Sequence, residues 1–154
     1  MTQTIRPLAD NPEAVPLLAR WFYAEWHSFD GRSRSTIEAQ LTENFHRDCI
    51  PITFLAMSGC EVVGTVSLDL SDLPPFDHLS PWLASLYVIP EARGAGIGTA
   101  LICHAQQYAA SRQINQLYLW TPGATSLYEK CGWTVLNRAH YHTRPITLMR
   151  FRAV

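Results

Sequence analysis

The segment from Arg93 to Gly98 has the residue types that an anion-binding loop needs. Its sequence is Arg-Gly-Ala-Gly-Ile-Gly, and it follows an apolar stretch, Trp82 to Ile89, that ends at Pro90. Glycine has no β-carbon, so a ligand can approach its backbone N–H groups closely. If a helix begins here, its first turn adds unpaired N–H groups and the positive end of its dipole. The segment therefore predicts a site for an anion such as phosphate, with Arg93 supplying a fixed positive charge.

Particular residues argue against two well-known nucleotide-binding loops. A P-loop ends in Gly-Lys-Ser/Thr, whereas Gly98 is followed by Thr99 and Ala100. The Rossmann fingerprint is Gly-x-Gly-x-x-Gly with an acidic residue about 20 positions later. Here the spacing is Gly-x-Gly-x-Gly, and no Asp or Glu occurs between Gly98 and Glu129. A structural turn without a ligand and a nucleotide-binding module of another class stay open as alternatives.

Periodicity predicts the elements that position this loop. Apolar residues at spacings of three and four predict helices, and short alternating or continuous apolar runs predict strands. We expect a capping box of Ser35 and Glu38 at the start of the second helix. The expected strands cover residues 5–8, 52–57, 62–68, 82–89, 116–120, 134–136 and 146–151, and the expected helices cover about residues 13–29, 35–46, 97–111 and 124–130. This order predicts one α/β domain of the α+β type over residues 1–154.

Composition sets the broad class of the chain. Apolar residues are 47% and charged residues 16% of the 154, a balance typical of a globular domain. The formal net charge of −1 gives no general attraction to nucleic acid or to an anionic membrane, so we expect neither as a partner. We find no apolar run of membrane-spanning length and no signal-peptide pattern, which favours a cytoplasmic location. The 4 cysteines contain no Cys-x-x-Cys pair; we expect free thiols and no metal.

A second motif lies downstream of the glycine segment, Leu127-Tyr128-Glu129-Lys130-Cys131-Gly132-Trp133. Together with Arg93-x-x-Gly96-x-Gly98 after the strand Leu86-Tyr87-Val88, it resembles the paired signatures of the GNAT N-acetyltransferase superfamily. The resemblance extends over nearly the whole chain. It implies a mixed, mostly antiparallel, twisted sheet of about six to seven strands flanked by about four helices.

The resemblance also implies a reaction. A neutral primary amine, on a small molecule, a peptide or a protein, attacks the thioester carbonyl of acetyl-CoA, and the thiolate leaves. The backbone N–H of Val88, at a strand bulge, stabilises the oxygen, and Tyr128 is the general acid for the thiolate. The implied cofactor contacts are Tyr87, Val88, Arg93, Gly94, Ala95, Gly96, Ile97, Gly98, Thr99 and Thr121, where Thr121 replaces an Asn common in the family. A catalytically silent acyl-CoA sensor on the same fold is the alternative.

The acceptor side is less defined by the sequence. Asp69, at the end of a strand, and Glu25, on the first helix, lead the candidates for the general base; the others are His27, Asp72, His78 and Glu91. His140 and His142 are expected on one strand face without a third metal ligand, and therefore in a substrate-lining or surface role. Aromatic side chains are expected to fill the core or to form a wall of the acceptor pocket: Trp21, Phe22, Trp26, Phe29, Phe76 and Trp82. We expect a monomer or a homodimer.

Overall fold

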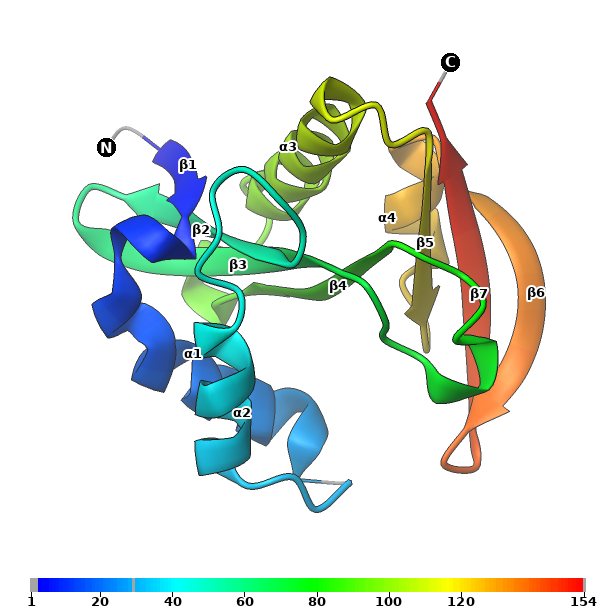
Figure 1. Ribbon diagram of the computed structural model, residues 1–154, viewed down its shortest axis with the longest axis horizontal. Coiled ribbons are helices and arrows are strands. Elements are labelled where there is room, and N and C mark those ends of the chain that lie inside the picture. Colours follow the sequence, from blue (N-terminus) through cyan, green and yellow to red (C-terminus); the bar gives the residue numbers. More distant parts are fainter. Residues whose placement is uncertain (1–2, 29, 154) are drawn as a thin grey trace.

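The computed structural model describes residues 3–28 and 30–153, which form a seven-stranded sheet flanked by helices (Figure 1). The strands are β1 Gln3–Pro7, β2 Ile52–Ser58, β3 Glu61–Asp69, β4 Trp82–Val88, β5 Gln116–Thr121, β6 Thr134–Tyr141 and β7 Arg144–Arg152. The α-helices are α1 Val15–Phe22, α2 Arg34–Thr42, α3 Ile97–Ser111 and α4 Thr125–Lys130. The order is β1-β2-β3-β4-β5-β7-β6, and only β4 and β5 pair in parallel. The predicted fold class is confirmed.

Side-chain alternation along β2 divides the core between the two faces of the sheet. Phe54 and Ala56 pack in the cluster that contains the apolar side of α3. Leu55 and Met57 point the other way and pack in the cluster that contains α1 and α2. Figure 1 shows the same division, with α1 and α2 on one side of the sheet and α3 on the other. Each face of the sheet is therefore covered by its own set of helices.

β4 and β5 meet at one point and then diverge. Their only Cα partners in the described chain are Trp82 and Tyr118. On its other side β4 carries a bulge, because Ser85 and Leu86 lie opposite a single β3 residue between the pairs Thr65–Tyr87 and Ser67–Ala84. Ser85 has a φ of 56°, in the left-handed region. A bulge bends its strand and increases the local twist. The bend turns the end of β4 away from β5 and opens the sheet.

The first helix buries apolar residues that recur along the chain at spacings of three and four, as expected for a helix. Val15, Leu18, Ala19 and Phe22 are all buried. The chain then continues as a π-helical turn, Tyr23–His27, in which the N–H of Ser28 donates to the carbonyl of Tyr23 at 2.9 Å. Phe29, named above among the aromatic residues, lies outside the described residues.

The predicted capping box of α2 is wrong. The helix begins at Arg34, and its N-cap is Ser33, whose Oγ accepts a hydrogen bond from the N–H of Thr36 at 3.1 Å. Ser33, Ser35 and Thr36 are all residue types that can cap a helix. Of these, Ser33 is the N-cap, and it has the extended backbone that a cap requires. Among the described residues, no helix is both long enough and apolar enough to span a membrane.

The C-terminal hairpin is longer than predicted, and this moves one histidine. β6 extends to Tyr141, and β7 begins at Arg144, so His142 and Thr143 form a two-residue turn. Both have left-handed φ values, 49° and 66°, as the tightest hairpin turns require. The expectation that His140 and His142 share a strand face is therefore wrong, because His142 lies in the turn.

Candidate active site

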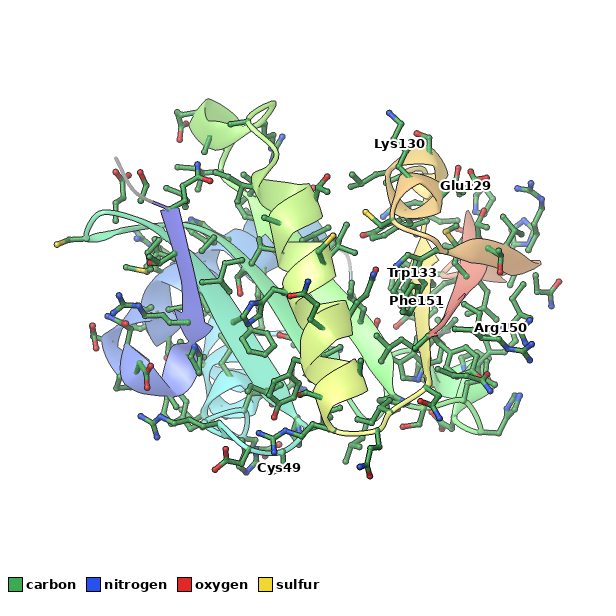
Figure 2. All side chains as sticks on the ribbon, turned by 90° about the horizontal axis from the view of Figure 1, so that it is seen from above. Cys49, Glu129, Lys130, Trp133, Arg150 and Phe151 are labelled. Carbon is green, nitrogen blue, oxygen red and sulfur yellow. The ribbon has the colours of Figure 1, made fainter. Side chains whose placement is uncertain are left out.

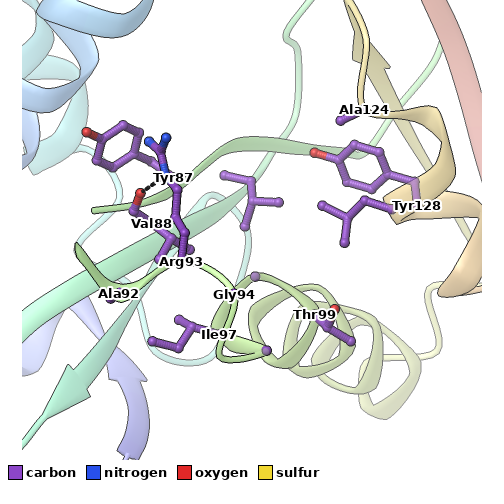
Figure 3. Close-up of a pocket in the computed structure, with 13 residues that line it drawn as sticks. Tyr87, Val88, Ala92, Arg93, Gly94, Ile97, Thr99, Ala124 and Tyr128 are labelled. Atoms are coloured by element: carbon purple, nitrogen blue, oxygen red, sulfur yellow. Dashed lines mark hydrogen bonds between the residues drawn. The ribbon is translucent and has the colours of Figure 1, made fainter. Parts of the chain in front are cut away.

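A cleft of about 490 Å³ lies where β4, the glycine segment and α4 approach one another (Figure 3). It opens at the point where β4 and β5 have separated. The residues that line it are Leu86, Tyr87, Val88, Ala92, Arg93, Gly94, Gly96, Ile97, Gly98, Thr99, Ala124, Leu127 and Tyr128. Both sequence motifs thus contribute to one cavity.

The glycine segment forms the junction between β4 and α3. Gly94 and Gly96 have φ values of 83° and 84°, which residues with a β-carbon adopt only with strain. A β-carbon on either would meet nothing within 4 Å, so the space beside them is open. Gly96 is the N-cap of α3, and no side chain caps the helix. The first N–H groups of α3 therefore have no side-chain partner at the cleft. They are available to an anionic ligand.

Arg93 is held at the edge of the cleft by two contacts. Its Nε donates to the carbonyl of Val88 at 2.8 Å, drawn as a dashed line in Figure 3. Its guanidinium lies 5.5 Å from the ring centroid of Tyr87. Tyr87 in turn packs on Trp21 of α1, with ring centroids 5.2 Å apart. The position of this positive charge is therefore set by β4 and by the aromatic side of α1.

Backbone N–H groups of β4 face the gap in the sheet. The N–H of Ile89 donates to the carbonyl of Val63 in β3 at 3.0 Å. Because successive residues of a strand hydrogen-bond to opposite sides, the N–H of Val88 points away from β3. The same alternation turns the N–H of Leu86, in the bulge, toward the gap. The bulge lies at Ser85 and Leu86, earlier than the position assigned to it from the sequence.

Tyr128 lies opposite β4 across the cleft (Figure 3). Its side chain is 8% exposed and packs on Trp133, with ring centroids 6.2 Å apart. No residue in the described part of the chain hydrogen-bonds to its hydroxyl, which leaves that group to whatever enters the cleft. Burial, together with the nearby thiol of Cys131, raises the pKa of Tyr128 to about 12. The phenol is therefore protonated at neutral pH.

Gly132 and Trp133 anchor the helix that carries Tyr128. Gly132 has a φ of 98°, and a β-carbon there would lie 3.3 Å from the ring of Phe151. Figure 2 shows Trp133 and Phe151 side by side between α3 and α4. The indole Nε1 of Trp133 donates to Oε1 of Gln106 in α3 at 2.7 Å. The second motif thus fixes α4 against α3, across the open part of the sheet.

Four of the predicted cofactor and catalytic residues do not line the cleft: Ala95, Thr121, Glu25 and Asp69. Ala95 is exposed and does not line it. The Oγ1 of Thr121 accepts hydrogen bonds from the N–H groups of Gly123, at 3.3 Å, and Ala124, at 3.0 Å. It thereby shapes the turn that leads into α4. Glu25 is exposed on the π-helical turn.

Asp69 lies toward the closed end of the sheet gap, away from the glycine loop along β3. It pairs with Trp82, whereas Gly64 pairs with Val88, so it is displaced along β3 by roughly 10–17 Å from the N–H groups of Leu86 and Val88. Its Oδ1 accepts a hydrogen bond from Nδ2 of Asn44 at 3.2 Å. Burial raises the pKa of Asp69 to about 6. The hydrogen bond from Asn44 has a smaller, opposite effect on this pKa.

The other candidate bases are scattered. His78 and Glu91 are exposed. His27 is half-buried beside Trp26, and its Nδ1 lies 2.9 Å from Oδ2 of Asp30. Burial lowers the pKa of His27, against the hydrogen bond with Asp30, which raises it. Within residues 3–28 and 30–153, no three His, Cys, Asp or Glu side chains are placed to hold a metal ion.

The sequence analysis missed four cleft residues. Leu86, Ala92, Ala124 and Leu127 supply apolar surface. Leu86 and Leu127 stand in the two motifs and were quoted only as their context. Nothing about an alanine in the sequence marks Ala92 or Ala124 as a cleft residue. The cleft forms only when the fold brings β4 and α4 together.

A family model described as the acetyltransferase (GNAT) family matches residues 15–133. The chain belongs to this family. Two relatives of the GNAT chain are N-acetyltransferase 8B of Homo sapiens, 28% identical over 82% of the chain, and N-acetyltransferase 8 of Rattus norvegicus, 31% identical over 73%. The chain spans 58% and 54% of the lengths of these two proteins.

The GNAT fold is also evident in solved structures. The crystal structure of an aminoglycoside 6'-N-acetyltransferase complexed with coenzyme A superposes with a TM-score of 0.74. The match covers 99% of this chain and 97% of the other, at 18% identity. At this identity the likeness concerns the fold alone.

Proposed function

We propose that this chain is an N-acetyltransferase that moves the acetyl group of acetyl-CoA to a primary amine of a small molecule, peptide or protein. The observation that carries the proposal is the cleft itself. It brings together an uncapped helix start, the free N–H groups of β4 and the hydroxyl of Tyr128. Membership of the family and the coenzyme A bound by a structural neighbour support the same ligand.

The glycine loop fits the pyrophosphate of acetyl-CoA. The N–H groups of Gly94, Gly96, Ile97, Gly98 and Thr99 would donate to its oxygens, with the backbone of Ala95 completing the loop. The open space beside Gly94 and Gly96 allows close approach of the phosphates. Arg93 adds positive charge at the edge, and Tyr87 and Val88 continue the surface toward the gap. Thr121 acts on the cofactor side through the turn it shapes before α4.

The N–H of Val88, together with that of Leu86, is the proposed donor to the acetyl oxygen as it becomes negative. Both belong to a strand fixed by β3, so they need no rearrangement when the charge develops. Removing one such donor typically raises the barrier by about 3 kcal/mol. Holding the thioester and the amine together adds the further advantage of a reaction between pre-positioned groups.

Tyr128 acts on the departing thiolate. With a pKa of about 12 the phenol remains protonated throughout the working range of the enzyme. A thiol ordinarily has a pKa of about 8.5, so complete proton transfer from Tyr128 to the thiolate is unfavourable. We therefore propose that its contribution as general acid consists chiefly of a hydrogen bond donated to the sulfur.

Asp69 is displaced from an amine at Val88, whereas Glu25, on the exposed turn next to Trp26, stays a prediction as the base. A base must lie within a hydrogen bond, or one water, of the proton it removes. Asp69 is roughly 10–17 Å away along β3, and Glu25 is exposed. We propose that the amine reacts in its neutral form and loses its proton to water in the cleft, and that Asp69 binds the acceptor.

Ligand-dependent melting tests the cofactor. Acetyl-CoA at 100 times its Kd is expected to stabilise the fold by about 2.7 kcal/mol, whereas NAD and ATP give no comparable shift. Absence of a shift with acetyl-CoA would contradict both the enzyme and a silent acyl-CoA sensor.

Thiol release with a panel of amines and peptides then separates the enzyme from the sensor. The enzyme releases coenzyme A in proportion to acetylated amine, whereas a sensor binds acetyl-CoA and releases none. The free hydroxyl of Tyr128 favours the enzyme. The extent of one domain over residues 1–154, the state as monomer or homodimer, and the cytoplasmic location stay predictions.

A further inference from the structure

Two carboxyl groups and a tryptophan gather on the face of the sheet opposite α3. Asp69 ends β3, Asp72 follows it, and Trp120 lies on β5. The surrounding apolar cluster contains Leu73, Trp82 and Leu148, with Trp120 packed against it. None of these residues lines the cleft described above. They lie at the closed end of the gap, where Trp82 pairs with Tyr118.

Neither carboxyl group forms an ion pair within the described part of the chain. Asp69 accepts from the neutral amide of Asn44. Arg32 is the basic residue that acts on Asp72. Its guanidinium is engaged elsewhere, because Nη1 donates to Oε1 of Gln40 at 3.0 Å and Nη2 lies 3.9 Å from Asp30.

The indole of Trp120 also has an unsatisfied hydrogen-bond donor. Its Nε1 is buried and has no hydrogen-bond partner. Asp72 is close enough for the indole to lower the pKa of its carboxyl, yet the two do not form a hydrogen bond of good geometry. A buried donor without an acceptor is unfavourable, and native structures rarely leave one without a reason. The indole ring lies tilted against the ring of Tyr141, with centroids 5.2 Å apart.

A single bound ammonium group would account for all three features. Burial, and then the negative charge of Asp69, raise the pKa of Asp72 well above its usual range. A neutral Asp72 is a weak acceptor for the indole N–H, whereas an ionised one is a strong acceptor. An ammonium group between the two carboxyls would let both ionise, and Trp120 would gain its acceptor.

We propose that Asp69, Asp72 and Trp120 bind a protonated amine of the acceptor that is distinct from the amine that reacts. This inference rests on the proposed acetyl transfer and names its substrate class: an elongated diamine or polyamine. The expected spacing between the reacting amine and the protonated amine follows from the position of Asp69 on β3. The backbone of Asp69 is displaced by roughly 10–17 Å along β3 from the N–H groups proposed to hold the acetyl oxygen.

A homologous series of acceptors tests the site. Thiol release is measured with α,ω-diamines from diaminobutane to diaminododecane and with the matching alkyl monoamines. The long diamines are expected to have KM values at least about tenfold below those of their monoamines, as a hydrogen bond to a charged group implies. Asp69→Asn and Asp72→Asn are expected to raise the KM of the long diamines to that of their monoamines, with the Kd of acetyl-CoA unchanged.

Asp77→Asn is the matched control. Asp77 is exposed on the same loop and accepts a hydrogen bond from Ser71 at 3.2 Å, outside the carboxyl pair. This variant is expected to keep the preference for diamines. Equal KM values for diamines and monoamines in the wild type, or a preference that survives in both Asn variants, would overturn the proposal.

Direct binding separates this inference from the proposed function. Isothermal titration of diaminodecane into the protein saturated with coenzyme A, which has no acetyl group to transfer, measures binding without turnover. Tighter binding than decylamine, lost in Asp72→Asn, supports the ammonium site even if no acetyl group is transferred. Equal binding of the two amines contradicts the site even in an active enzyme.

Discussion

At the scale of single residues, the burial of Tyr128 determines how readily its hydroxyl gives up a proton. The environment that fixes the ring against Trp133 also raises the pKa of the hydroxyl to about 12. The side chain is thereby well suited to donate a hydrogen bond and poorly suited to give up its proton. Its contribution to the rate should resemble that of one strong hydrogen bond.

Tyr128→Phe is expected to lower kcat by about 10- to 100-fold, toward the small end of the range for acid catalysts, and to leave the Kd of acetyl-CoA nearly unchanged. Steady-state thiol release and ligand titration measure the two quantities. Tyr118→Phe is the control, because the hydroxyl of Tyr118 bonds to Gln116 on the other face of β5. Unchanged turnover in Tyr128→Phe would remove this residue from the mechanism.

The sequence was most informative about residues whose role depends only on their own backbone conformation and their neighbours in the chain. Gly94 and Gly96 were identified from spacing alone, and both have the left-handed backbone that only glycine adopts easily. Asp69, Asp72 and Trp120 could not be grouped in this way. Their proximity depends on how β3 and β5 are placed by the sheet, and no spacing within the chain records it.

At the scale of elements, the junction of β4 and α3 combines a bulge, two left-handed glycines and an uncapped helix. The sequence predicted the strand, the loop and the helix, because apolar periodicity and glycine spacing are local signals. The resemblance implied a bulge at Val88, but the bulge lies at Ser85 and Leu86, where neither glycine nor proline marks it. The bulge is set by pairing with β3, and that is a tertiary interaction.

Gly96→Ala tests this junction. A φ of 84° with free space around the site means that the cost is conformational, about 1–2 kcal/mol of unfolding free energy. Because the substitution strains the helix start, the Kd of acetyl-CoA is also expected to rise. Urea unfolding and ligand titration check the two effects.

Gly31→Ala provides a matched control in the loop between α1 and α2. Gly31 has a φ of 77°, and a β-carbon there would also meet nothing within 4 Å. The variant is expected to lose similar stability with no change in the Kd of acetyl-CoA. Equal weakening of acetyl-CoA binding in both variants would show that the loss in Gly96→Ala is a general effect of stability.

At the scale of the whole molecule, the sheet consists of two parts. β1 to β4 form one part and β5, β7 and β6 the other, and the ladder between them is the pair Trp82–Tyr118. The bond between Trp133 and Gln106 adds a second link through α3. A ligand in the cleft touches both parts, since Val88 and Tyr128 lie on its opposite walls.

Hydrogen exchange should report this bridging. Acetyl-CoA is expected to slow the exchange of the amides of Leu86 and Val88 and of the first turn of α3. Amides of β1, which lies at the far edge of the sheet, should change little. Uniform protection of all strands would instead indicate that the ligand only raises global stability.

The divergence of β4 and β5 has a consequence for how the protein meets other chains. An unpaired strand edge usually invites association, because another polypeptide can pair with it. Here two such edges face each other inside the sheet and converge on Trp82 and Tyr118. A wedge that narrows to contact admits a slender, unbranched molecule but not a strand with side chains on both faces. The opening that accommodates a small ligand thereby also protects these edges from aggregation.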